Sequence, residues 1–229
     1  GKECPVLLVT SAVPEEGKTT IAVNLALAFS KKNFRVVLID GDFRNPSVAQ
    51  QLNLVRRKDG VVQVVRGQAK LEDVVVEYKD SKLKILPGFS KTSSPATVIR
   101  SDKMRELMKT LKEQADVIVI DTPPSAVLSD AAMFEEYADG AIMVVRQDFA
   151  SAQQIQRGME TLADADIPVI GYVLNYVEAG TMGYGYSSYG KYGYRRYGYG
   201  YGKYGYDKYG YGQHGEKTKS SEKQEKQSV

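Results

Sequence analysis

One loop of the sequence has residue types suited to binding phosphate groups. It reads Ala12, four further residues, then Gly17, Lys18 and Thr19, which is the Walker A pattern with Ala12 where the first glycine usually stands. In such a loop, backbone N–H groups and a helix N-terminus receive phosphate oxygens, the lysine reaches the terminal phosphates and the hydroxyl binds Mg²⁺. We therefore predict a nucleotide site made of these residues: Ala12, Val13, Pro14, Glu15, Glu16, Gly17, Lys18, Thr19 and Thr20.

Two aspartates follow the apolar run 36–39. Asp40 and Asp42, with Arg44 close behind, would lie at the carboxyl end of a parallel strand, where doubly wound sheets bind ligands. Beside a triphosphate they would repel the phosphates unless Mg²⁺ or a role in proton transfer compensated their charge. Alternatively, they open a turn and cap a helix that starts at Pro46. Next to a Walker A loop we favour the role in the site.

A third stretch, VIVIDTPP at 117–124, has four aliphatic residues followed by Asp121. This is the Walker B arrangement, in which the carboxylate at the strand end orients Mg²⁺ or its water. Many buried strands end in Asp, so this motif alone is weak evidence for a nucleotide site. It becomes strong evidence because a Walker A loop precedes it in the sequence. Asp130, farther along, is either a helix cap or a site residue, and we favour the cap.

The elements that must position these residues follow from the hydrophobic pattern. Short apolar runs predict strands at 6–9, 36–39, 83–86, 117–120, 141–145 and 169–174. Apolar residues at helical spacing predict a helix from Ile21 and another at about 150–164. A further amphipathic helix would turn these residues inward: Met104, Leu107, Met108 and Leu111. Alternating strands and helices predict an α/β fold, P-loop NTPase-like, with a mostly parallel sheet covered by helices on both faces.

The amino-acid composition limits the classes of protein to which this chain can belong. The 229 residues are 42% hydrophobic and 26% charged, enough for one globular domain with an appendage. No apolar run reaches the roughly 18 to 20 residues of a membrane-spanning helix. A single cysteine, Cys4, excludes an internal disulfide, and with one histidine no Cys/His zinc site is recognisable. We expect a cytosolic location, and, because a strand follows Gly1 almost at once, a piece of a longer chain.

The composition changes after about Val177, which predicts a domain at 1–177 and a separate segment at 178–229. The segment has nine Lys and Arg against five Asp and Glu, whereas the rest of the chain has 22 against 23. A near-neutral domain with a mildly basic tail is not typical of a duplex-DNA reader. Rich in glycine and poor in aliphatic residues, the segment is expected to be disordered. It holds twelve of the sixteen tyrosines: Tyr184, Tyr186, Tyr189, Tyr192, Tyr194, Tyr197, Tyr199, Tyr201, Tyr204, Tyr206, Tyr209 and Tyr211.

Three functions fit such a segment. Its tyrosines could be phosphorylation acceptors, each phosphate adding about −1.5 to −2 charges. Its alternation of aromatic and basic residues could bind single-stranded nucleic acid by stacking. It could also be a self-associating, low-complexity segment.

Together, AVPEEGKTT, LIDGDFR, VIVIDTPP and the tyrosine cluster resemble the bacterial tyrosine kinases (BY-kinases) of exopolysaccharide and capsule export. The resemblance covers the whole chain. It implies ATP and Mg²⁺ as cofactors, with Lys18 on the β- and γ-phosphates, and Thr19, Asp42 and Asp121 at the metal. It also implies Asp40 as the base toward the acceptor hydroxyl, and Arg44 as part of the additional Walker A′ motif at the nucleotide. The twelve tyrosines would be the phosphoacceptors, modified mainly in trans.

The resemblance further implies partners and a location. These are a ring-like homo-oligomer, a transmembrane polysaccharide co-polymerase or activator on the same or a separate chain, and a protein-tyrosine phosphatase. Nucleic acid is not expected. The chain would act in the cytoplasm, at the inner face of the cell membrane.

Two points depart from simple membership. The family usually carries a helical segment with a Glu/Arg motif before the first strand, and none precedes the strand here. The motifs also resemble those of division-site-placing and chromosome-partitioning ATPases, which makes a P-loop switch ATPase the alternative function. Those proteins have a signature lysine where aligning on GKTT places Val13. The missing lysine and the tyrosine cluster favour the kinase.

Overall fold

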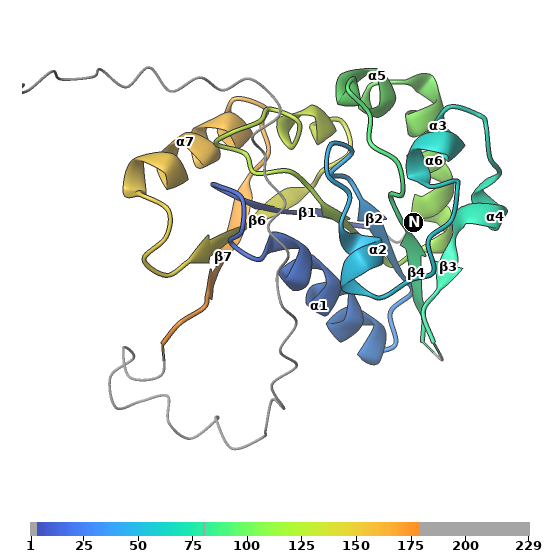
Figure 1. Cartoon of the computed structure of the whole chain (residues 1–229), viewed down its shortest axis with the longest axis horizontal. Helices are drawn as coiled ribbons and strands as arrows, with labels where there is room; N and C mark the ends of the chain where they lie inside the picture. Colours follow the sequence, from blue (N-terminus) through green and yellow to red (C-terminus); the bar gives the residue numbers. More distant parts are fainter. Residues whose placement is uncertain (1–3, 80, 179–229) are drawn as a thin grey trace, which may run out of the picture. The chain divides into compact units, whose positions relative to one another are not determined.

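The computed structural model describes residues 4–79 and 81–178. They form a seven-stranded sheet in the order β3-β4-β2-β5-β1-β6-β7, with helices on both faces (Figure 1). Residues 179–229, which include all twelve tyrosines of the predicted segment, lie outside the described residues. The disorder predicted for residues 178–229 therefore stays a prediction, and so do the roles of their tyrosines.

The strands follow the apolar runs of the sequence. Their bounds are β1 (Val6–Ser11), β2 (Val36–Asp40), β3 (Val76–Glu77), β4 (Leu83–Leu86), β5 (Val117–Asp121), β6 (Gly140–Arg146) and β7 (Val169–Asn175). All neighbouring strands pair in parallel except β3 and β4, which are antiparallel. The α/β class and the mostly parallel sheet are thus confirmed, and each predicted strand is present.

The helices are of two sizes. Three are long: α1 (Lys18–Lys31), α6 (Asp102–Gln114) and α7 (Ala152–Ala163). The short ones are α2 (Val48–Gln51), α3 (Val61–Val65), α4 (Leu71–Val74), α5 (Pro95–Ile99) and the 3₁₀ turn η1 (Ala132–Phe134). Ser101 caps α6 and Ser151 caps α7, since each hydroxyl accepts a bond from the backbone N–H three residues on. The four residues predicted to face inward from α6 are all buried.

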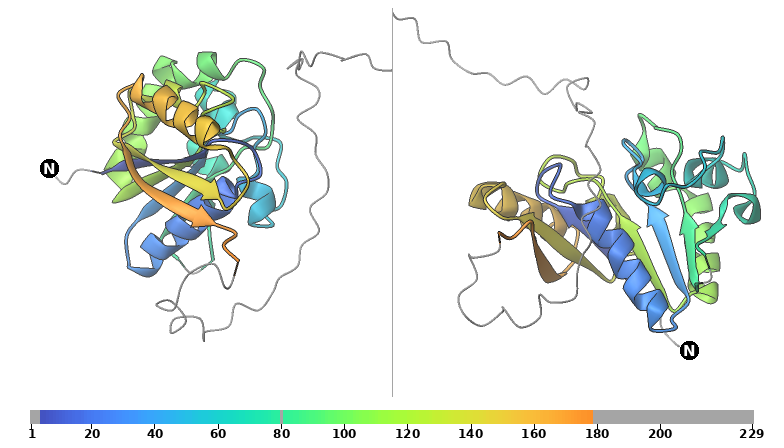
Figure 2. Two further views of the ribbon diagram at one scale, coloured as in Figure 1. Left: turned by 90° about the vertical axis from the view of Figure 1, so that its left-hand side faces the viewer. Right: turned by 60° about the horizontal axis from the view of Figure 1, so that its bottom comes forward.

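Two separate cores lie on the two faces of the sheet, as the alternation of strand side chains requires. In β2, Val36 and Leu38 belong to a core that includes the buried face of α1. Val37 and Ile39 belong to a larger core that includes residues of α3, α6 and α7. The left view of Figure 2 shows the sheet between α1 and α7. A strand buried on both faces reads as a continuous apolar run, which is why these strands were recognisable.

The parallel register brings the functional stretches together. Asp40 and Asp121 are directly paired at the carboxyl ends of β2 and β5, and β5 also pairs with β1, which leads into the predicted phosphate loop. Crossovers in one direction place all three ends at a single edge of the sheet. The described residues contain no helix long and apolar enough to cross a membrane.

Candidate functional site

The predicted phosphate loop connects β1 to α1. The buried carboxylate of Glu16, a residue of the loop itself, fixes it in place through hydrogen bonds to the backbone. Glu16 is fully buried, and its two oxygens accept bonds from the backbone N–H of Val13 at 2.8 Å and of Arg146 at 3.2 Å. Asn175, the last residue of β7, donates from its side chain to the Glu16 carbonyl at 2.9 Å. The loop is therefore fastened to the ends of both β6 and β7.

Gly17 is the loop position that requires glycine. Its φ of 91° lies in the left-handed region, and a Cβ there would lie 2.3 Å from Nδ2 of Asn175. Ala12, which replaces the usual first glycine, is fully buried and tolerates its methyl group. The backbone from 12 to 17 is thus shaped as a loop at the N-terminus of α1, with Thr20 in the first helical turn.

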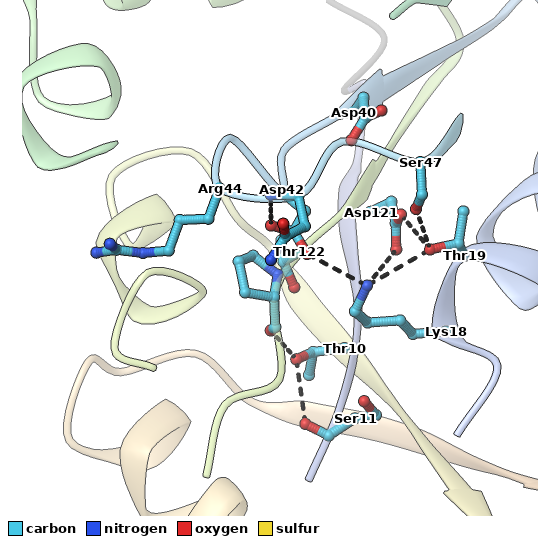
Figure 3. A network of polar contacts seen from close by, with 12 residues as sticks. Thr10, Ser11, Lys18, Thr19, Asp40, Asp42, Arg44, Ser47, Asp121 and Thr122 are labelled. Atoms are coloured by element: carbon cyan, nitrogen blue, oxygen red, sulfur yellow. Dashed lines mark hydrogen bonds and ion pairs between the residues drawn. The ribbon is translucent and has the colours of Figure 1, made fainter. Parts of the chain in front are cut away.

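Lys18 and Thr19 meet the carboxylates of two other strands (Figure 3). The Lys18 ammonium lies 3.5 Å from Oδ2 of Asp42 and 3.9 Å from Oδ1 of Asp121. The Thr19 hydroxyl donates to Oδ2 of Asp121 at 2.7 Å and lies 3.0 Å from the hydroxyl of Ser47. The structure brings together the four residues that sequence analysis assigned to phosphate and metal binding, although Asp121 is more than 100 positions from Lys18 and Thr19.

The buried carboxylates fit a divalent cation. Asp40 and Asp121 are fully buried, and one oxygen of each, Oδ1, has no hydrogen-bond partner among the described residues. Burial raises the pKa of Asp121 to about 6, against the lowering influence of Lys18 and the Thr19 bond. Burial, then the neighbouring Asp121 and Asp42, hold the pKa of Asp40 well above its usual range. A bound cation would compensate this concentration of negative charge.

The ligand set resembles that of Mg²⁺ bound with a nucleotide. Within 4–79 and 81–178, no group of three or more Asp, Glu, His or Cys side chains is spaced to hold a metal alone. Mg²⁺ is usually bound by one or two carboxylates together with waters and substrate phosphates. Asp121, Asp42 and the Thr19 hydroxyl would supply the protein ligands.

Asp40 and Asp42 also accept hydrogen bonds from the backbone of the turn and helix that follow β2, which is the structural role that the sequence offered as an alternative. Asp40 accepts a bond from the backbone N–H of Val48 at 3.0 Å, at the start of α2, and Asp42 accepts one from Asn45 at 2.8 Å. The helix begins at Val48, two residues after the predicted Pro46. Each aspartate uses one oxygen for this purpose. The other oxygen of Asp42 accepts from Lys18, and the other oxygen of Asp40 has no hydrogen-bond partner among the described residues.

Arg44 pairs with Asp130. Its guanidinium donates two bonds to the carboxylate, at 2.6 and 3.1 Å, and Asp130 is 2% exposed. Asp130 does not cap η1, whose N-cap is Ala131, so its sequence-based interpretation as a cap was wrong. The pair ties the loop after β2 to the loop after β5. The predicted contact of Arg44 with a nucleotide stays a prediction.

Sequence reasoning missed Ser47 and Asn175. Ser47 reaches Thr19 through a hydroxyl contact, and Asn175 supports the loop from β7. The sequence did contain a signal for Asn175. This polar residue directly follows the apolar run 169–174, which was predicted to be a strand of the same sheet. Nothing local distinguished Ser47 from a helix cap.

Comparisons with known proteins agree with this geometry. A profile of a family described as AAA domain (AAA_31) matches residues 15–166. The tyrosine-protein kinase CpsD of Streptococcus pneumoniae serotype 4 is 31% identical over 81% of this chain and 82% of its own length. The solved VpsO kinase domain is 32% identical, with a TM-score of 0.71 over 76% of this chain and 86% of that one.

A more distant structure shares the fold. The septum site-determining protein MinD of Pyrococcus horikoshii, solved with Mg-ADP, is 26% identical, with a TM-score of 0.62 over 75% of this chain and 70% of that one. The profile match spans residues 15–166, which include Lys18, Thr19, Asp42 and Asp121, and the match to CpsD extends over 81% of the chain. The chain belongs to the AAA domain family and, within it, to the bacterial tyrosine kinases.

Proposed function

We propose that the chain transfers the γ-phosphoryl group of ATP to tyrosines of the segment 184–211, mainly in a second copy of itself. The observation that carries the proposal is the convergence of Lys18, Thr19, Asp42 and Asp121 at one edge of the sheet. The similarity to tyrosine kinases and the twelve acceptor tyrosines support it.

In the proposed reaction, the tyrosine oxygen forms a bond to the γ-phosphorus as the bond to ADP breaks. The phenolic proton passes to Asp40, a buried carboxylate at the carboxyl end of β2 whose Oδ1 has no hydrogen-bond partner among the described residues. Lys18 would neutralise charge on the phosphates, and Mg²⁺ would supply further neutralisation when bound. Most of the acceleration would come from positioning, because phosphoryl transfer requires little covalent chemistry from the protein.

A neighbour's acceptor segment would reach this site easily. A chain of about 50 residues, if flexible, has a root-mean-square span of roughly 35 to 42 Å. As in the resemblance stated above, we propose a ring-like homo-oligomer at the inner face of the membrane. We also propose a transmembrane activator, a protein-tyrosine phosphatase that reverses the reaction, and a role in regulating exopolysaccharide or capsule synthesis.

Phosphopeptide mass spectrometry of the purified chain, incubated with Mg²⁺ and ATP, tests the proposal. Phosphotyrosine within 184–211 is expected in the wild type and not in Lys18→Met. Phosphotyrosine that persists in Lys18→Met, purified away from other kinases, would rule the assignment out. ADP formed without phosphotyrosine would favour the alternative, a switch ATPase of the partitioning type.

A further inference from the structure

Glu15 is held in a backbone conformation that glycine normally supplies. Its φ is 68°, in the left-handed region, which a residue with a Cβ adopts only at a cost in free energy. Two positions later the same loop uses glycine, at Gly17, for a similar conformation. The Glu15 side chain is exposed. A strained, exposed carboxylate in a binding loop points to a function of the side chain itself.

The carboxylate lies at the wall of a shallow pocket of about 470 Å³. Six described residues line it: Val13, Pro14, Glu15, Val127, Phe149 and Gln154. Glu15 is the charged one among these six. Val127 is 40% and Phe149 43% exposed, so the pocket offers apolar and aromatic surface to a second molecule. Arg146 lies 4.5 Å from the Phe149 ring centroid and helps to hold that ring in place.

Such a pocket suits an aromatic ring that is directly preceded by a cation. The apolar walls would bury part of the ring, and the carboxylate would pair with the cation. Glu15 is three residues from Lys18, so a side chain bound here would lie beside the phosphate-binding loop.

The segment 184–211, which holds the proposed acceptor tyrosines, places cations next to tyrosines in a regular pattern. Between 184 and 211 there are five basic residues and one acidic residue. Four of the basic residues stand directly before a tyrosine, in the pairs Lys191-Tyr192, Arg196-Tyr197, Lys203-Tyr204 and Lys208-Tyr209. The other eight tyrosines of the segment follow a glycine or a serine. The segment therefore contains two classes of acceptor that differ in charge at one adjacent position.

We propose that Glu15 is a specificity-determining residue that selects, in the segment of a second copy, the tyrosines preceded by Lys or Arg. The selected acceptors are Tyr192, Tyr197, Tyr204 and Tyr209. This inference rests on the proposed function and adds to it which tyrosines are used first. A partly exposed ion pair of this kind supports a preference of about two- to fivefold, which decreases as salt screens it.

The experiment measures site occupancy in one acceptor with different enzymes. The acceptor is the full-length Lys18→Met chain labelled with ¹⁵N, so that its peptides are distinguished by mass from those of the unlabelled enzyme. The enzymes are the wild type, Glu15→Gln, Glu15→Gly, Glu15→Asp and, as a control distant from the loop, Glu113→Gln. The measured quantity is the initial phosphorylation rate of the four selected tyrosines divided by that of the other eight. Changes in nucleotide binding cancel in this ratio.

We expect a ratio of about two to five for the wild type, Glu15→Asp and Glu113→Gln, and a ratio near one for Glu15→Gln and Glu15→Gly. Glu15→Gln removes the charge and keeps the backbone strain, whereas Glu15→Gly removes both, so equal ratios in these two variants assign the preference to the charge. A ratio near one in the wild type, or an unchanged ratio in Glu15→Gln, would overturn the role of Glu15 and leave the kinase assignment standing. No phosphotyrosine in the acceptor with any enzyme would overturn the proposed function and this inference with it.

Discussion

Replacing Gly17 by alanine tests how the phosphate loop is supported. The new Cβ would lie 2.3 Å from Nδ2 of Asn175, so that side chain must turn away and lose its bond to the Glu16 carbonyl. The left-handed backbone contributes roughly 1 to 2 kcal/mol of strain. The lost hydrogen bond contributes roughly 1 kcal/mol more. We expect Gly17→Ala to lower the free energy of unfolding by about 2 to 3 kcal/mol.

Gly67 provides a matched control. Its φ of 69° is also left-handed, but a Cβ there has nothing within 4 Å, so Gly67→Ala should cost about 1 to 2 kcal/mol, from strain alone. Urea unfolding of both variants, and of Gly17→Ala in an Asn175→Ala background, gives the measurement. In that background the effect of Gly17→Ala should fall to about 1 to 2 kcal/mol, the strain alone. Equal effects of the two glycine substitutions, or full additivity with Asn175→Ala, would refute the contact.

Three other predictions concern the remaining buried charges. Arg44→Ala should destabilise the protein by about 2 to 4 kcal/mol, because it leaves Asp130 buried and unpaired. Adding Asp130→Asn should recover part of that loss of stability, measured by thermal unfolding. No recovery in the double variant would contradict the pair. Glu16→Gln should lower stability by about 1 to 3 kcal/mol, since an amide can accept from only one of the two N–H groups; an unchanged melting temperature would contradict this. Asp40→Asn should lower kcat by roughly 100-fold or more and change the affinity for ATP little. If kcat and the affinity for ATP fell by similar factors, Asp40 would be assigned to nucleotide binding instead.

Much of the fold was readable from the sequence because its central strands, such as β2 and β5, are buried on both faces. Runs such as 36–39 and 117–120 are apolar throughout, and the helices between them have clear periodicity or caps. β3 escaped prediction because it is a two-residue edge strand, Val76–Glu77, which pairs with β4 and has no hydrophobic pattern of its own. The shift of α2 from Pro46 to Val48 is a local boundary error of the kind expected at a short helix.

The site was predictable where its residues share a motif, and not where they meet only through the fold. Lys18 was recognisable from the Walker A pattern, and Asp42 and Asp121 from the apolar runs that precede them. The bond between Arg44 and Asp130 joins residues 86 positions apart, and their motifs give no reason to connect them. The supports of the loop from β6 and β7 depend on strand order, which sequence periodicity does not determine.

The most direct test of the central claim compares two products of one reaction. The wild type would be rapidly mixed with Mg²⁺ and ATP, quenched at successive times, and assayed for ADP and for phosphotyrosine in residues 184–211. Phosphoryl transfer to tyrosine predicts that the two products appear together, at the same rate and in a one-to-one ratio during the first turnover. ADP that accumulates with no matching phosphotyrosine would contradict the account.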